Sequence, residues 1–246
     1  MQYPNEINWS ALKSEIISNG EKKIKLTPIS CGKLNLSSGK LIVCDPFARM
    51  NKSDNAFVKI QAGEYEVIVT LADVSPNLDG SHFREAYASL IIDENAIEAY
   101  RECIELTKSG EPSKQPLNDG EFYGYGVDAG TVCFADAEAI DLYMPPEETW
   151  YEGLFENNDS NCWFEQMDNE NLIRNGIANI PLPLNKDENL ILFHSGWGDG
   201  VYPVVGGYDS NGKLIAIHTD FFVMLAPESD EKSNEPILKP WWKFWL

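Results

Sequence analysis

The stretch GYGVDAGTVCFADAEA, residues 124–139, places two apolar runs on either side of an aspartate-glycine turn. Glycine supplies the positive φ that tight turns require, and β-branched and aromatic residues favour strands. The stretch therefore predicts two strands that pivot on the Asp-Ala-Gly turn at 128–130. After the second strand, residues 135–143 are typical of a helix with Asp136 near its start.

The rest of the chain is typical of short strands. HSGWGDGVYPVVGGYDSNGK, residues 194–213, repeats the pattern and carries an Asn-Gly pair that favours a hairpin turn. From Lys22 onward, runs rich in β-branched and aromatic residues are bounded by Gly, Asn, Asp or Pro. Short helices are expected over 150–155 and 161–167, and roughly helical spacing of apolar residues predicts another over 5–19. The predicted fold is α+β and β-dominated, with mostly antiparallel sheets, two of them packed together.

The chain divides into one domain and a tail. Its 246 residues are 43% hydrophobic, which is enough to fill one large core. We expect residues 1–226 to form a single α+β domain, with its main internal break in the polar loop over 107–120. Residues 227–246 form a charged, proline-punctuated linker that ends in WWKFWL.

The tail is predicted to bind something, because clustered aromatic side chains are costly to leave in water. Three hypotheses remain open: the tail folds back on its own core, docks on a partner or a second copy of the chain, or touches a membrane interface. The acidic body of the chain opposes the membrane hypothesis. The predicted partner-binding residues are Trp241, Trp242, Phe244 and Trp245.

Charge narrows the class of partner. The formal net charge is -20, from 39 acidic and 19 basic side chains. Such a chain repels phosphate backbones, so we expect no nucleic-acid binding. An acidic surface could instead capture a basic protein. No run of about 18 apolar residues occurs, so no transmembrane segment is predicted.

Cysteine usage indicates a reducing compartment. The five cysteines are odd in number and contain no C-x-x-C pair. Most lie among apolar neighbours, which is typical of buried, reduced thiols in a cytoplasmic protein. The N-terminus also lacks the basic and apolar regions of a signal peptide.

Five aspartates at predicted strand ends or in glycine-containing turns support two hypotheses. Each carboxylate could cap a turn by accepting backbone N–H bonds. Alternatively, several could converge into an acidic pocket that binds a divalent cation or a proton, although no cofactor is otherwise expected. These candidate pocket residues are Asp45, Asp128, Asp136, Asp199 and Asp220.

Arg84 completes the candidate pocket. It begins an apolar strand in a chain that is poor in arginine. Its guanidinium could pair with one of the aspartates or bind an anion. His194 and Ser195 are adjacent on a strand and point to opposite faces, so no catalytic serine–histidine pair is expected there. His218 is predicted to be a hydrogen-bonded strand histidine.

The motifs GYGVDAGTVCFAD, KLIVCDPF, GEYEVIVTLADV, REAYASLII and SGWGDGVYPVVGGYDSNGKL resemble a bacterial family, domain of unknown function 4241. The resemblance covers roughly residues 39–222. It implies no established activity, cofactor or catalytic residue. By analogy, families of this kind lie near toxin systems in which acidic, non-enzymatic proteins act as immunity factors.

Two functions are therefore expected. The first is a non-enzymatic binding protein of the immunity type, which neutralises a basic partner through its acidic surface. The alternative is a hydrolase or metal-dependent enzyme that uses the aspartates and Arg84.

Overall fold

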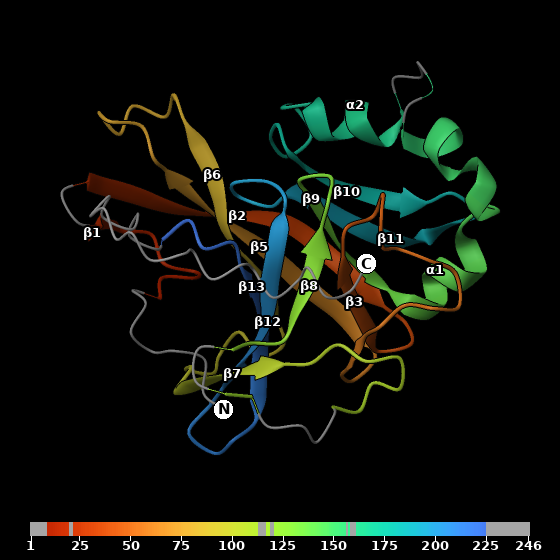
Figure 1. The fold of residues 1–246 in the computed structure, drawn as a ribbon, viewed down its shortest axis with the longest axis horizontal. Coiled ribbons are helices and arrows are strands. Elements are labelled where there is room, and N and C mark those ends of the chain that lie inside the picture. The colour runs from red at the N-terminus through yellow and green to blue at the C-terminus, as the bar shows by residue number, and fades with distance from the viewer. Residues whose placement is uncertain are drawn as a thin grey trace, which may run out of the picture.

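The computed structural model describes residues 9–19, 22–112, 117–118, 121–155, 157 and 161–224. Two antiparallel sheets dominate this part of the chain (Figure 1). The larger sheet has eight strands, in the order β1 (Ile16–Asn19), β2 (Lys22–Leu36), β5 (Gly63–Asp73), β6 (Phe83–Ile91), β13 (Leu214–Asp220), β12 (Gly200–Tyr208) and β7 (Tyr100–Ile104), with β8 (Gly124–Val127) also paired to β12.

The smaller sheet has five strands and carries the helices. Its order is β10 (Ile177–Leu182), β11 (Asn185–His194), β9 (Thr131–Asp136), β3 (Lys40–Cys44) and β4 (Val58–Lys59). The helical segments are α1 (Ala137–Tyr143), the 3₁₀ turn η1 (Glu147–Thr149), the π-helical turn η2 (Tyr151–Phe155) and α2 (Trp163–Asp168). None of the helices in the described ranges is long and apolar enough to span a membrane. The predicted β-dominated α+β fold is confirmed.

Alternation along the strands of the smaller sheet creates three layers. In β9, Val132 and Phe134 belong to the core shared with the larger sheet. Cys133 and Ala135, between and after them, belong to a second core beneath the helices. Since both faces of the sheet are buried, β9 is apolar from Val132 to Ala135, as is usual for strands that are covered on both sides. Figure 1 shows the helices along the outer side of this sheet.

The two aspartate-glycine stretches lie where the layers join. The turn at 128–130 connects β8 of the larger sheet to β9 of the smaller sheet. The predicted pivot between two strands is therefore a crossing between sheets, because β8 pairs with β12 and β9 pairs with β11 and β3. The predicted hairpin between β12 and β13 is also present, with Gly212 at φ +81°.

The predicted helix over 5–19 is wrong for the part of it that is described. Residues 16–19 form β1, which pairs with β2 and places Ile17 opposite Ile24. Leu12 has φ +65°, a left-handed conformation that a helix does not contain. Two adjacent β-branched isoleucines fit a strand edge better than a helix, and pairing with β2 decides between the two.

The turn that joins β2 to β3 requires glycine at position 39. Gly39 has φ +72°, and a side chain there would collide with the carbonyl oxygen of Ile60. We expect Gly39→Ala to lower the free energy of unfolding by more than about 2 kcal/mol. Gly153→Ala is the matched control, since no atom lies within 4 Å of its Cβ position. Urea denaturation of both variants checks this prediction, and equal stabilities would contradict it.

Candidate functional site

Asp45 is a fully buried carboxylate that accepts four backbone hydrogen bonds. Its Oδ1 accepts from the N–H groups of Phe47 and Ala48, at 2.8 and 3.2 Å. Its Oδ2 accepts from the N–H groups of Asp128 and Ala129, at 2.8 and 2.7 Å. The first two donors lie in the loop after β3 and the other two in the turn between β8 and β9. Asp45 therefore ties that loop to the crossing between the sheets.

The second aspartate-glycine stretch meets the first at Gly130. The Gly130 N–H donates to Asp199 Oδ1 at 3.0 Å, and its carbonyl accepts from the Ser195 N–H at 3.0 Å. Asp128 forms a 3.0 Å ion pair with Arg49, but both side chains are about 60% exposed, so the pair contributes little to stability. We call Asp45, Asp128, Gly130 and Asp199 the turn cluster.

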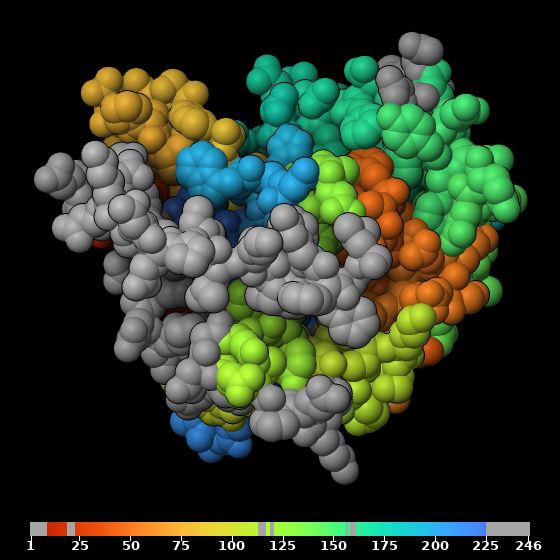
Figure 2. All heavy atoms as spheres, viewed as in Figure 1, coloured from red at the N-terminus to blue at the C-terminus, as the bar shows by residue number. Residues whose placement is uncertain are grey.

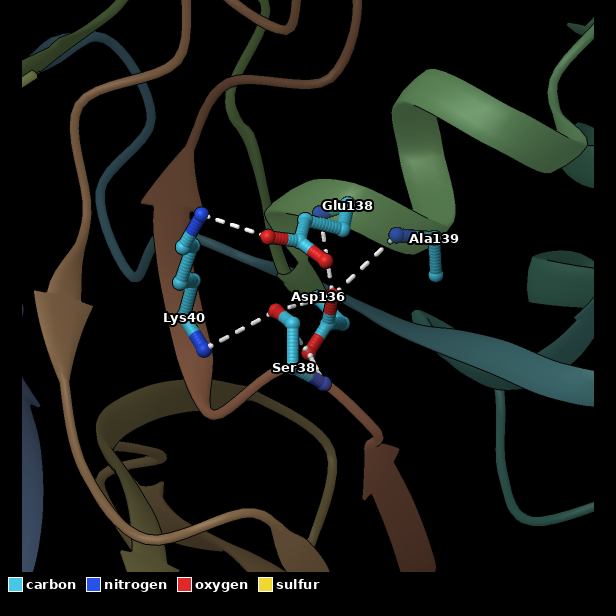
Figure 3. Close-up of polar contacts among 5 residues, drawn as sticks. All are labelled: Ser38, Lys40, Asp136, Glu138 and Ala139. Carbon is cyan, nitrogen blue, oxygen red and sulfur yellow. Dashed lines mark hydrogen bonds and ion pairs between the residues drawn. The ribbon is translucent and has the colours of Figure 1, made fainter.

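Asp136 lies at the opposite end of β9 and joins a helix to a turn (Figure 3). Its Oδ1 accepts from the N–H groups of Glu138 and Ala139 at 2.9 and 3.1 Å, which caps α1. Its Oδ2 accepts from the Ser38 N–H at 2.9 Å. The Ser38 hydroxyl donates to the same carboxylate, and Lys40 pairs with Glu138 beside it. Asp136 therefore fastens α1 to the turn between β2 and β3.

Asp220 and Arg84 lie on two other strands, and Arg84 contacts the turn that carries Asp199 through the Trp197 ring. Asp220 is buried at the end of β13, where its Oδ1 accepts from the Phe222 N–H at 2.8 Å. Arg84 lies on β6, with its guanidinium carbon 5.1 Å from the centre of the Trp197 ring. In the described part of the chain, no aspartate forms an ion pair with Arg84.

These contacts favour turn capping over a convergent acidic pocket. The structure brings together Asp45, Asp128 and Asp199 but leaves Asp136, Asp220 and Arg84 elsewhere. Both carboxylate oxygens of Asp45 and of Asp136 are engaged by N–H donors, which leaves them poorly placed as metal ligands. Among the residues that the structure describes, no three Asp, Glu, His or Cys side chains are grouped to hold a metal ion.

His218 forms a buried hydrogen-bond network. The sequence predicted a hydrogen-bonded histidine on a strand but not its partners. Its Nδ1 lies 2.8 Å from Ser89 Oγ and its Nε2 lies 3.1 Å from Glu98 Oε2. Ser89 is fully buried on β6, directly opposite His218 on β13, and the Trp9 ring lies edge-on to the imidazole at 5.3 Å. Since a nucleophilic hydroxyl must be reachable by substrate, this arrangement indicates a structural hydrogen-bond network.

All five cysteines are free thiols, as predicted, and four of them are buried. Burial raises the pKa of Cys31 to about 12 and that of Cys103 to about 11. Such thiols stay protonated at neutral pH, which makes them poor nucleophiles.

An acidic surface on the helices is the feature that sequence reasoning missed. Residues 115–173 contain 14 acidic side chains and no lysine or arginine, and this count was available from the sequence. Within this segment, the helices over the smaller sheet lie in the described residues 137–155 and 161–168, and Figure 2 shows them, in green to teal, along the upper and right-hand surface. We define the helical layer as residues 137–155 and 161–170. Its exposed acidic side chains are Glu138, Glu147, Glu148, Glu152, Glu165, Asp168 and Glu170.

Apolar groups accompany the charge of the helical layer. Leu142 is 64% exposed and Tyr151 is 56% exposed, although both are large hydrophobic side chains. A cavity of about 190 Å³ lies beside Tyr151, and its walls include Phe47, Trp150 and Glu147. Small-molecule sites occupy about 300–1,000 Å³, so this cavity fits one side chain of a partner better than a cofactor.

The fold and this surface define a two-sheet α+β protein with an acidic helical face. The chain belongs to the family described as "Protein of unknown function (DUF4241)", whose family model matches residues 34–219. No curated protein and no solved structure matches the chain.

Proposed function

We propose that this chain is a non-enzymatic binding protein that captures a basic protein partner on its helical layer, as an immunity-type protein captures a toxin domain. The observation that carries the proposal is the segment of 59 residues, 115–173, with 14 acidic and no basic side chains. The acidic side chains of this segment that are exposed on the helical layer attract an oppositely charged partner from solution and repel acidic ones.

The apolar groups of the helical layer can supply the binding affinity that charge alone does not. Protein interfaces draw most of their affinity from a few aromatic or apolar anchors that are surrounded by a polar rim. Tyr151 and Leu142 are exposed on the same helical layer as the acidic side chains and can act as such anchors. The cavity beside Tyr151 has Glu147 in its wall, which suits a lysine or arginine side chain from the partner.

Matched charge-reversal variants test the proposal. One variant combines Glu148→Lys, Glu152→Lys and Glu165→Lys, all exposed and all on the helical layer. The control combines Glu94→Lys, Glu111→Lys and Asp187→Lys, which are exposed elsewhere. Each reversal adds two charge units, so both variants move from -20 to -14.

The wild-type chain and both variants are used to capture partners from a lysate of the host cell, and the affinity for any stoichiometric basic partner is then measured. We expect the helical-layer variant to bind at least about tenfold more weakly, mainly through slower association, while the control binds like wild type. Equal loss in both variants would show that only overall charge matters. Retention of no basic partner by wild type would contradict the proposal.

Partner binding by the C-terminal tail is a separate prediction. Trp241, Trp242, Phe244 and Trp245 lie outside the described residues. A version of the chain that ends at residue 240 shows whether they contribute to the same binding or to self-association.

A further inference from the structure

The four arginines of this chain differ in their ionic partners. Arg49 and Arg101 each form an ion pair with a carboxylate. Arg84 and Arg174 form none among the described residues, in a chain where acidic side chains outnumber basic ones 39 to 19. An arginine that forms no ion pair can direct its planar set of donors to an anion from outside the chain.

The guanidinium groups of Arg84 and Arg174 each lie over an aromatic ring. The Arg84 guanidinium carbon lies 5.1 Å from the centre of the Trp197 ring, and that of Arg174 lies 4.7 Å from the centre of the Phe83 ring. Arg84 Nη1 donates to the carbonyl of Phe83, while its Nε is buried and has no hydrogen-bond partner among the residues that the structure describes. A buried guanidinium N–H without an acceptor is costly unless a ligand supplies one.

A buried carboxyl group and a histidine lie beside these arginines. Glu85 is only 6% exposed and forms no ion pair in the described ranges. Gly176, at φ +89°, brings Glu85 and His194 together. A Cβ there would lie 2.7 Å from His194 Nδ1 and 3.4 Å from Glu85 Oε1, so the two side chains occupy the space that glycine leaves.

The four groups interact electrostatically. Burial raises the pKa of Glu85 to about 7, and Arg174 and Arg84 oppose that rise. Burial lowers the pKa of His194, and the same two arginines lower it further, while Asp168 on α2 raises it. Glu85 is therefore partly protonated near neutral pH and able to donate a hydrogen bond. We call Arg84, Glu85, Arg174 and His194 the arginine cluster.

We propose that the arginine cluster binds a small oxyanion, the phosphate or carboxylate group of a ligand, between the guanidinium groups of Arg84 and Arg174. Planar guanidinium groups form paired hydrogen bonds with both kinds of oxyanion. The buried Arg84 Nε is a donor without an acceptor in the described part of the chain, and His194 and Glu85 are two further groups that can donate a hydrogen bond to a bound oxygen. The proposal is independent of the helical layer and its partner.

Titration of the full chain with inorganic phosphate, and separately with acetate, tests the proposal. The histidine ring signals are followed by NMR, with His194→Gln used to assign His194, and heats of binding are measured in parallel. We expect saturable binding with a dissociation constant below about 1 mM for at least one of the two anions, and a shift of the His194 signal. The anion that binds more tightly identifies the class of ligand.

Arginine variants show where the anion binds. Arg84→Ala and Arg174→Ala are each expected to weaken binding at least about tenfold, whereas Arg49→Ala, which removes an arginine with the same change in net charge, has no such effect. The wild-type titration needs no variant to fold. No saturable shift of His194 with either anion, or equal weakening by Arg49→Ala, would overturn the proposal.

Discussion

Replacing Asp45 by alanine is expected to lower the free energy of unfolding by about 3–5 kcal/mol. The carboxylate is fully buried and accepts N–H bonds from Phe47, Ala48, Asp128 and Ala129. Alanine removes the acceptor, and all four N–H groups then lose the carboxylate that they share. The cost is large because both the loop after β3 and the crossing between the sheets depend on the same side chain.

Asp128→Ala is the matched control for this prediction. Asp128 belongs to the same turn cluster, but its side chain is exposed and forms a surface ion pair with Arg49. Its removal is expected to change stability by less than about 1 kcal/mol. Guanidinium denaturation of both variants measures the difference. If Asp45→Ala costs no more than Asp128→Ala, the carboxylate is not the structural tie described above.

The second large effect is a pH dependence of stability that arises at Glu85. Burial raises its pKa from 4.5 to about 7, so the folded protein holds the proton over a range where the unfolded chain has lost it. The contribution of Glu85 to stability is complete below pH 4.5 and is lost as pH rises to 7 and above. A pKa difference of this size corresponds to about 3 kcal/mol.

Glu85→Gln removes this titration while keeping the shape of the side chain. We expect the stability of the variant relative to wild type to rise by about 3 kcal/mol between pH 4 and pH 8. Glu94→Gln, at an exposed position, is the control and is expected to show no such rise. Urea denaturation at several pH values measures the difference, and a constant difference across this range would contradict the assigned burial of Glu85.

Local sequence predicted the sheets well because strand pattern and turn chemistry are short-range signals. The Asp-Ala-Gly turn at 128–130 and the Asn-Gly pair before β13 both lie where expected. The helix over 5–19 was predicted wrongly, since helical spacing and strand propensity compete there. Pairing of Ile17 with Ile24 settles that competition, and pairing is not visible in a local window.

The candidate site was less predictable, because function depends on which strand ends meet. Asp45, Asp128 and Asp199 share one place, whereas Asp136 lies at the far end of β9. Both placements follow from sheet order, which the sequence alone does not specify. The arginine cluster combines residues from β6, β11 and the loop before β10, and no local motif marks it. The acidic segment 115–173, in contrast, was visible as a plain count of charges.

The turn cluster and the helical layer differ in what their acidic side chains contact. In the turn cluster, the buried carboxylate of Asp45 is occupied by backbone donors and serves the fold. On the helical layer, acidic side chains such as Glu148 and Glu152 are exposed and available to a partner. We therefore expect a partner to bind on the helical layer and to leave the turn cluster unchanged.

Hydrogen–deuterium exchange of the full chain, alone and with its captured basic partner, tests this claim most directly. We expect slower exchange over the helical layer when the partner is bound, and unchanged exchange at the turns near 45–50, 128–130 and 195–199. Slower exchange confined to those turns, with the helical layer unaffected, would contradict it and place the functional site at the aspartate-glycine turns.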